Sequence, residues 1–363
     1  MTGGFTGVRV LQDEHHVGAA AEIVAARHGD LVDRAPFLPP RTAEDYHGKL
    51  TWLTEHGVVL GRWHQGRLTA FLGGVRIGDF RRAGPGCFSP DWANGAGEPA
   101  SAFDDYRVLY REIAPRWNAT GARIHALEVF ASAATAIEAL SLTGFGRIVM
   151  DAAAPTAEVA ARAAAPPTTD DVGGETPAAK RPAGGHAAPE RVAGENLAAD
   201  HPLPDHPLAE GVAVRRATPD DAAALAAMES HLAEHIGASP VFLPNPRGAD
   251  ADWWRGWLAE PTSVAFLAQM RGAAVGYVKA EGPQDDVSDV VHDPSCLAIN
   301  GMYCDPSARG RGVGRTLLAV LAGHAAATGR SLMSVDCETH NLEAYGFWAR
   351  FFTPVTWSFE RRV

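Results

Sequence analysis

Apolar and polar positions along the chain follow two periods, and the two halves repeat them in the same order. A spacing of three to four residues predicts a helix, and a spacing of two predicts a strand. The order in the first half is a strand, two helices, a hairpin, a helix, a strand, a helix and a strand. The predicted ranges are 7–11, 13–31, a helix from 42, 58–63 with 67–77, 103–117, 123–130, 133–142 and 147–152.

The second half restarts this pattern after a sharp helix-initiation signal. Thr218 supplies a capping hydroxyl, Pro219 suits the first helical position, and two acids follow. The predicted ranges are strand 212–217, helix to about 236, helix 250–260, hairpin 263–270 with 274–281, strand 296–304, a helix through Leu317, strand 331–337, a helix from Asn341 and strand 355–362. This alternation predicts an α/β fold with a mixed sheet in each of two domains.

The stretch between the halves has a different composition. Residues 153–210 are rich in Ala, Pro, Gly and Thr, with almost no aromatic or β-branched periodicity. Such a segment buries too little apolar surface to offset the entropy of the chain. We therefore expect one domain over 1–152, a flexible linker over 153–210 and a second domain over 211–363.

One stretch of the second domain carries most of the chemistry. Residues 299–318 predict a strand, a tight glycine loop and a helix. Gly310, Gly312 and Gly314 let backbone N–H groups point into one concavity at a helix N-terminus, which is a phosphate-binding arrangement. The loop also holds three cations, which suit a ligand with several phosphate charges: Arg309, Arg311 and Arg315.

Two common phosphate-binding loops do not fit this stretch. A Walker loop requires Gly-Lys-Ser/Thr, whereas Gly314 is followed by Arg315 and Thr316. A dinucleotide fold requires Gly-x-Gly-x-x-Gly with an acid about 20 residues later, and the spacing here is different. Both classes are therefore excluded for this loop.

The loop and its surroundings resemble the GNAT acyltransferases. Residues 309–314 match the Arg/Gln-x-x-Gly-x-Gly/Ala signature, and Asn341, Ala344 and the aromatic pair Phe347-Trp348 match the helix that follows. The resemblance covers 212–363, and it is similar in particular to tandem GNAT proteins of actinobacterial type. It implies two GNAT-like domains, each a mostly antiparallel twisted sheet with a splayed central strand pair flanked by helices.

The resemblance also implies a binding site for coenzyme A. The loop would hold the diphosphate of acetyl-CoA or another short acyl-CoA, the strand backbone would hold pantetheine and the thioester carbonyl, and the following helix would line the pantetheine arm. The residues implied are Met302, Tyr303, Cys304, Arg309, Gly310, Arg311, Gly312, Val313, Gly314, Arg315, Thr316, Asn341, Phe347 and Trp348. Asn341 has an alternative interpretation as a helix cap.

The first half offers no equivalent loop. Before its third helix stand Gly95 and Gly97 with Glu98 and no arginine, and the acid would repel a phosphate. We interpret residues 1–152 as a degenerate GNAT-like domain that does not bind coenzyme A.

Acyl transfer to an amine requires a base, an oxyanion-binding group and an acid for the departing thiolate. Alternation places Asp336, Glu338 and His340 on one face if the strand continues that far, and we favour Glu338 and then His340 as the base. Trp348 stands where most of the family has the tyrosine that protonates the thiolate. Either Tyr345, one turn earlier, replaces it, or water and the ammonium product supply the proton.

Composition narrows the function classes. The net charge of −11 and the pI of about 5.7 argue against a nucleic-acid binder and mildly favour amine substrates. The four cysteines form no C-x-x-C pair, so we expect neither a metal site nor disulfides. No signal peptide or apolar run of membrane-spanning length is evident, so we expect a cytoplasmic protein without a membrane partner.

These observations predict an N-acyltransferase that transfers acetyl from acetyl-CoA to the primary amine of a small molecule. Two alternatives remain open: transfer to a hydroxyl or of a longer acyl group, and a non-catalytic acyl-CoA sensor or assembly protein. The sequence does not name the acceptor, and the chain is either a monomer that mimics a dimer or a homodimer.

Overall fold

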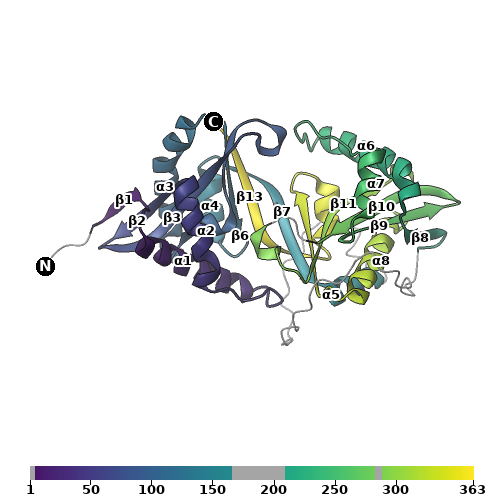
Figure 1. Ribbon diagram of the computed structural model, residues 1–363, viewed down its shortest axis with the longest axis horizontal. Coiled ribbons are helices and arrows are strands. Elements are labelled where there is room, and N and C mark those ends of the chain that lie inside the picture. Colours follow the sequence, from purple (N-terminus) through teal and green to yellow (C-terminus); the bar gives the residue numbers. More distant parts are fainter. Residues whose placement is uncertain (1–4, 166–208, 283–287) are drawn as a thin grey trace. The chain divides into compact units, whose positions relative to one another are not determined.

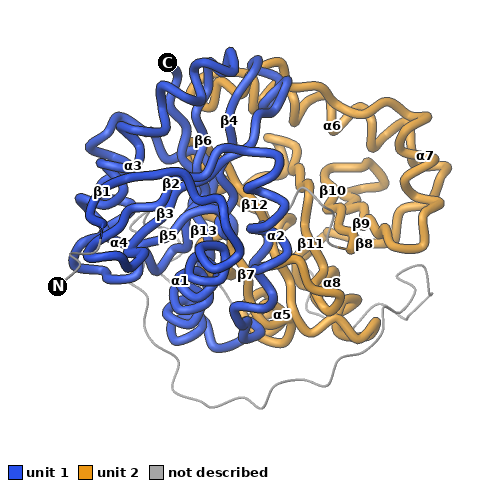
Figure 2. The backbone as a smooth tube through the Cα atoms, turned by 60° about the vertical axis from the view of Figure 1, so that its left-hand side comes forward, with its two compact units in different colours: residues 1–151, 288–290, 354–363 blue, residues 152–287, 291–353 orange. Residues whose placement is uncertain are grey.

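The computed structural model describes residues 5–165, 209–282 and 288–363, and these form two compact units. The first unit contains the chain up to Asp151 together with Ser288–Val290 and Pro354–Val363. The second contains Ala152–Val287 and Val291–Thr353. Figure 2 distinguishes the units by colour, and Figure 1 labels their elements.

The first unit contains a mixed sheet with helices packed against it. In chain order its elements are β1 (Gly7–Val10), α1 (Glu14–Val32), α2 (Ala43–His56), β2 (Val58–His64), β3 (Arg67–Ile77), β4 (Gly86–Ser89), β5 (Asn94–Ala96), α3 (Pro99–Ala119), β6 (Ile124–Phe130), α4 (Ala134–Leu142), β7 (Gly146–Pro155, which continues into the second unit) and most of β13 (Thr353–Arg362). The strand order is β1-β2-β3-β4-β6-β13, and only β4 and β6 pair in parallel.

The second unit repeats the order of elements. It contains α5 (Thr156–Ala164), β8 (Val212–Arg216), α6 (Ala222–Gly237), α7 (Ala251–Ala259), β9 (Ser263–Met270), β10 (Ala273–Glu281), β11 (Cys296–Cys304), the 3₁₀ turn η6 (Pro306–Ala308), α8 (Val313–Ala327), β12 (Leu332–Glu338) and α9 (Leu342–Trp348). The strand order is β8-β9-β10-β11-β12, with only β11 and β12 parallel. Helices α6 and α7 lie on one side of this sheet and α8 on the other (Figure 1).

The apolar periodicities found in the sequence form the two cores. The largest fully buried side chains of the first unit come from its helices and strands and from Leu11 just after β1: Leu11, Leu31, Tyr46, Leu50, Leu53, Phe71, Trp117 and Phe359. In the second unit, one buried cluster joins α6 and α7 to the sheet through Leu225, Met228, Trp254, Trp257, Leu267, Tyr277 and Tyr303. Burial of such side chains is the main favourable term in folding.

Two predicted boundaries differ from the structure. The predicted linker begins with ordered elements, because residues 153–155 complete β7 and Thr156–Ala164 form α5. Buried Val159 and Ala163 recur four residues apart, a short helical stripe that the alanine-rich composition obscured. The rest of the predicted linker, residues 166–208, lies outside the described residues.

The last strand is the second difference. We predicted 355–362 as the closing strand of the second domain, but Pro354–Val363 belongs to the first unit, where β13 pairs antiparallel with β6 from Thr356↔Phe130 to Arg362↔Ile124. Alternation of apolar residues shows that a strand is half-buried but does not show which sheet edge it joins.

Candidate functional site

The glycine loop forms a left-handed turn at the start of α8. Gly310 has φ +73° and Gly312 φ +79°, conformations that residues with a Cβ rarely adopt. Gly312 is the N-cap residue of α8, and the first backbone bond across it runs from the Thr316 N–H to the Gly312 carbonyl at 2.9 Å. The N–H groups of the first turn therefore have no partner within the helix. Together with the helix dipole, they form a site suited to an anion.

The three arginines of the loop are placed differently. Arg309 donates to the Cys304 carbonyl (3.3 Å) and pairs with Glu343 on α9 (2.7 Å), and the Arg311 side chain is exposed. Arg315 donates to the carbonyls of Ala163 (3.0 Å) and Arg162 (2.7 Å) at the end of α5. Arg309 and Arg311 are therefore better placed than Arg315 to meet a ligand at the glycine turn.

Strands β11 and β12 part beside this loop. Their parallel pairing runs from Cys296↔Leu332 to Ile299↔Val335, whereas β11 stays paired with β10 as far as Cys304. Beyond Ile299, β11 thus turns its other backbone edge toward a gap that a ligand with amide groups can fill. This is the splayed strand pair expected from the sequence resemblance.

Met302, Gly314 and Phe347 lie close together at the start of α8. A Cβ at Gly314 would lie 3.6 Å from the Phe347 ring and 3.9 Å from Met302 Sδ. By contrast Trp348, Tyr303, Val313 and Thr316 are buried, and Trp348 packs against Phe352 with 5.8 Å between ring centroids. Among these predicted ligand residues, the side chains of Met302 and Phe347 are the ones gathered at the glycine loop.

Asn341 has the structural role that the sequence left open. Its side-chain oxygen accepts from the Ala344 N–H at 3.3 Å and caps α9. The amide nitrogen of Asn341 does not take part in this bond, so the cap leaves it able to donate to a ligand.

Glu338 and His340 lie close together at the end of β12. Glu338 is the last residue of the strand, and His340 follows in a turn, so the two do not share a strand face as alternation suggested. The strand ends at Glu338, and Asn341 caps α9 three residues later. His340 Nε2 lies 3.9 Å from Glu338 Oε2. Both side chains are partly exposed, and Tyr345 is half-buried on α9.

The second unit also contains a cluster of polar side chains around Glu281 that the sequence did not predict. Glu281 at the end of β10 accepts from Trp257 Nε1 at 3.1 Å and from the Asn300 side-chain amide. On the same strand, Lys279 pairs with Glu229 on α6 at 2.9 Å. The alternation of β10 places Lys279 and Glu281 on one face, but no sequence pattern links them to Trp257 or Glu229.

The matching gap in the first unit is closed by its own side chains. Strands β4 and β6 part after Ser89↔Leu127, and there the Asn94 amide donates to Ser89 Oγ (3.1 Å), the Pro90 carbonyl (2.9 Å) and the Glu128 carbonyl (2.9 Å). Tyr106 donates to Asn94 Oδ1 at 2.7 Å. A buried asparagine whose side chain is fully hydrogen-bonded therefore lies where these two strands part.

Two buried carboxyl groups lie next to this closed gap. Burial raises the pKa of Asp91 well above its usual value, and the charge of Glu128 raises it further. Burial likewise raises the pKa of Glu128, against the hydrogen bond from Thr356 at 2.6 Å. Nearby, Asp289 pairs with Arg41 (2.6 Å) and Lys49. These groups hold Ser288–Val290 in the first unit.

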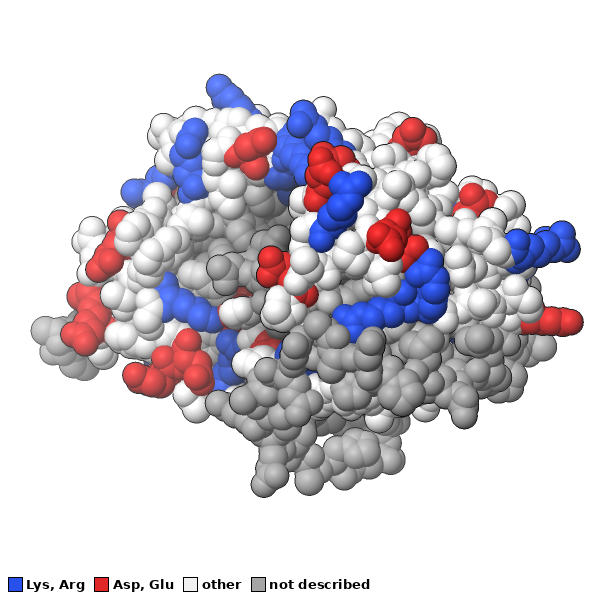
Figure 3. Space-filling view, turned by 45° about the vertical axis from the view of Figure 1, so that its right-hand side comes forward, with Lys and Arg blue, Asp and Glu red and all other residues white. Residues whose placement is uncertain are grey.

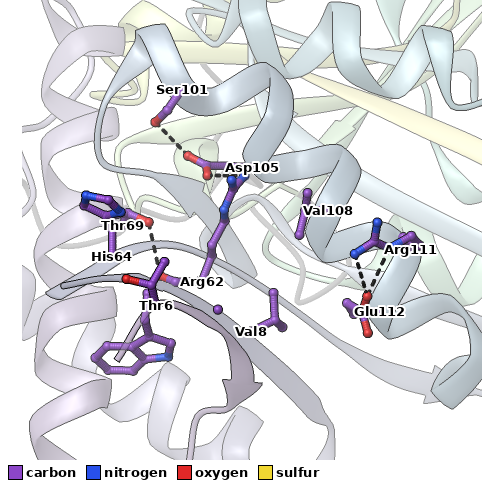
Figure 4. A pocket seen from close by; sticks show the side chains of 12 residues that line it. Thr6, Val8, Arg62, His64, Thr69, Ser101, Asp105, Val108, Arg111 and Glu112 are labelled. Carbon is purple, nitrogen blue, oxygen red and sulfur yellow. Dashed lines mark hydrogen bonds and ion pairs between the residues drawn. The ribbon is translucent and has the colours of Figure 1, made fainter. Parts of the chain in front are cut away.

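Each unit also has a surface cavity. In the first unit, a cavity of about 560 Å³ lies between β2 and α3, where Arg62 pairs with the buried Asp105 at 2.8 Å and Ser101 donates to Asp105 at 2.7 Å (Figure 4). In the second, about 450 Å³ lies beside the glycine loop, lined by His231, Glu234, His235, Tyr303, Asp305, Pro306 and Arg309.

Within the described parts of the chain, no cluster of three His, Cys, Asp or Glu side chains is arranged to hold a metal ion. Nor does any helix in those parts reach the length and apolarity needed to cross a bilayer. Among the described residues on the face in Figure 3, acidic and basic side chains are interspersed.

Comparisons with known proteins agree with this geometry. Residues 227–352, which contain the glycine loop, match the family model described as Acetyltransferase (GNAT) family. The GCN5-related N-acetyltransferase from Sphaerobacter thermophilus matches 98% of this chain and 95% of its own, with a TM-score of 0.52 and 14% identity. A comparison with curated proteins finds no match.

Two further solved structures match nearly the whole chain at lower scores. A tandem GNAT protein from the clavulanic acid biosynthesis pathway matches 99% of this chain and 98% of its own, with a TM-score of 0.43 and 12% identity. A GCN5-related N-acetyltransferase from Kribbella flavida matches 98% and 71%, with a TM-score of 0.36 and 13% identity.

Residues 227–352 thus match the GNAT family model, and the likeness over nearly the whole chain shows a two-domain GNAT fold, with the order of elements repeated in the two halves. Proteins of this family are acyltransferases that bind acyl-CoA.

Proposed function

We propose that the second unit transfers an acyl group, acetyl in the first place, from acyl-CoA to the primary amine of a small molecule. The observation that carries this proposal is the turn at Gly310 and Gly312, which aims the N–H groups of α8 at one point beside the parted strands β11 and β12. The turn suits the diphosphate of coenzyme A, and the gap suits its pantetheine arm.

The backbone of β11 has the main role in binding the acyl group. Beyond Ile299, an N–H of Met302 or Cys304 that points toward the gap donates to the thioester carbonyl and stabilises the oxyanion that forms when the amine attacks. The Asn341 amide donates to pantetheine, and Met302 and Phe347 line the arm. This arrangement lowers the barrier because its donors are fixed before the reaction begins.

The base and the acid come from the end of β12 and from α9. Glu338, supported by His340 at 3.9 Å, accepts the proton of the attacking amine. Tyr345 donates a proton to the departing thiolate of coenzyme A, because the indole of Trp348 is a very weak donor and is buried. The amine nitrogen thus becomes an amide, and the thioester sulfur leaves as a thiol.

The test is thiol release from acetyl-CoA and longer acyl-CoA esters, with a panel of small amines and matched alcohols. We expect turnover with an amine and none with the alcohol of the same skeleton. Coenzyme A binding by calorimetry without turnover of any acceptor would instead favour the sensor, and turnover of alcohols alone would favour an O-acyltransferase. No binding and no turnover would contradict the proposal outright.

A further inference from the structure

The group around Glu281 lies beside the place where β11 and β12 part. The pairing of β10 with β11 shifts between Lys279↔Gly301 and Ala280↔Ile299, so Asn300 is an extra residue on β11. A bulge of this kind redirects a side chain, and the Asn300 amide contacts the Glu281 carboxylate. Asn300 stands two residues before Met302, which is about 7 Å along a strand.

Both oxygens of Glu281 are held by neutral donors. Oε2 accepts from Trp257 Nε1 at 3.1 Å, and Oε1 accepts from Asn300 Nδ2. Among the described residues, no Lys or Arg forms an ion pair with Glu281, which is only partly buried. The carboxylate is thus fixed in position while its negative charge remains uncompensated.

The tryptophans of α7, next to Glu281, and Glu229 already bind one alkylammonium group, that of Lys279. Its nitrogen lies 2.9 Å from Glu229 Oε1 and 4.8, 5.2 and 6.0 Å from the ring centroids of Trp253, Trp254 and Trp257. Indole faces attract cations in this range. Trp253 is 44% exposed and stacks on Trp257 at 5.9 Å, so aromatic surface beside Glu281 reaches the solvent.

The charges of Glu229, Lys279 and Glu281 do not balance. Glu229 and Lys279 neutralise each other, so the group as a whole keeps the negative charge of Glu281. A positive group on the acceptor would complete it. That group cannot be the nitrogen that is acylated, because this nitrogen must be neutral when it attacks and it ends as an uncharged amide. A separate positive group of the acceptor, which keeps its charge throughout the reaction, fits the site best.

We propose that Glu281, with the exposed indole face of Trp253 beside it, binds a second cationic group of the acceptor. The enzyme then prefers small diamines, and related amines that carry a separate positive charge, over monoamines. This inference rests on the proposed acyltransferase function and adds the class of acceptor. Glu281 acts in specificity, because it binds a part of the acceptor that does not react.

The test compares 1,4-diaminobutane and related α,ω-diamines with monoamines of the same chain length, in the full chain with acetyl-CoA. Glu281→Gln keeps the shape and removes the charge. We expect it to lower the ratio of kcat/KM for diamine over monoamine at least tenfold, mainly through KM for the diamine, because the contact is the same before and during the reaction. Trp257→Phe, which removes the indole donor and part of the ring but keeps the charge of Glu281, should lower the ratio less.

The matched control is Glu260→Gln, which removes an exposed carboxylate from the end of α7 in the same unit. It should leave the ratio within twofold of wild type. A Glu281→Gln ratio within twofold of wild type, or an equal fall with Glu260→Gln, would overturn the inference. Thermal melts of each variant show whether the protein is folded.

A separate arm distinguishes failure of this inference from failure of the proposed function. If wild type turns over neither amine class, calorimetric titration of 1,4-diaminobutane into the coenzyme A complex still reports on the site. Binding that Glu281→Gln weakens tenfold would support the subsite without catalysis, whereas no binding by wild type would overturn it. Turnover of monoamines with no preference for diamines would refute this inference and leave the acyltransferase function standing.

Discussion

Replacing Gly314 by Asp should separate anion binding from protein stability at the glycine loop. Gly314 is the second helical residue after the Gly312 cap, and its φ is not in the left-handed region. A Cβ there makes only ordinary contacts, at 3.6 Å to Phe347 and 3.9 Å to Met302 Sδ. The new side chain therefore fits the protein, and it adds a negative charge to the first turn of α8, next to the N–H groups proposed to hold the diphosphate.

The two expected effects have opposite signs. Replacing a helical glycine and placing an acid in the first turn of the helix should together raise the free energy of unfolding by about 0.5 to 1 kcal/mol. A carboxylate about 5 Å from one phosphate charge, at an effective dielectric constant of about 20, costs roughly 3 kcal/mol. Exposure and salt reduce that cost to about half, which still weakens coenzyme A binding about tenfold.

The assay measures acetyl-CoA affinity by equilibrium dialysis and stability by urea unfolding for wild type, Gly314→Asp and the neutral isostere Gly314→Asn. Only the Asp variant should lose tenfold in affinity, while Asn should lose less than threefold. An Asp variant that is stable and binds within twofold of wild type would refute the phosphate site at this loop. Equal losses in both variants would mean that the effect is steric.

Three further outcomes are expected. Glu338→Gln should lower kcat for thiol release at least a hundredfold with acetyl-CoA affinity unchanged; an unaltered rate would remove Glu338 as the base. Because the pKa values of Asp91 and Glu128 are raised, these two groups bind more protons in the folded state than in the unfolded state above about pH 4, and the stability they contribute is lost as the pH rises. The urea midpoint of the wild type should therefore fall relative to that of Asp91→Asn between pH 5 and pH 8; a constant difference would contradict this. Gly276→Ala should lower stability by about 1 to 3 kcal/mol, because its Cβ would stand 2.8 Å from the Tyr303 carbonyl oxygen; an unchanged urea midpoint would contradict this close approach of the two strands.

Local signals in the sequence predicted most of the fold. The capping threonine and proline at 218–219 mark the start of the helical segment that continues as α6, and the glycine loop ends where α8 begins. Apolar spacing also gave the order of elements in both halves, because it reflects which face of each element is buried. The short strand β4 was missed, since its four residues carry too few alternations to be distinguished from a loop.

Tertiary relations could not be predicted in the same way. The pattern of 355–362 shows a half-buried strand, but not that it pairs with β6. Arg315 was assigned to phosphate by its position in the loop, and its contacts with Ala163 and Arg162 depend on a helix in a stretch expected to be linker.

The group around Glu281 was not predicted either, because it too depends on tertiary contacts. Glu281 and Trp257 are 24 residues apart and belong to different kinds of element. The contact that joins them depends on how α7 lies on the sheet and on the bulge at Asn300. Neither feature has a local signature in this chain.

The central claim is that the second unit alone binds coenzyme A. The most direct measurement is calorimetric titration of coenzyme A into the wild-type protein, read for stoichiometry. We predict one molecule bound per chain, because Asn94 closes the matching gap of the first unit. Two molecules per chain, or no heat of binding at any concentration tried, would contradict the account.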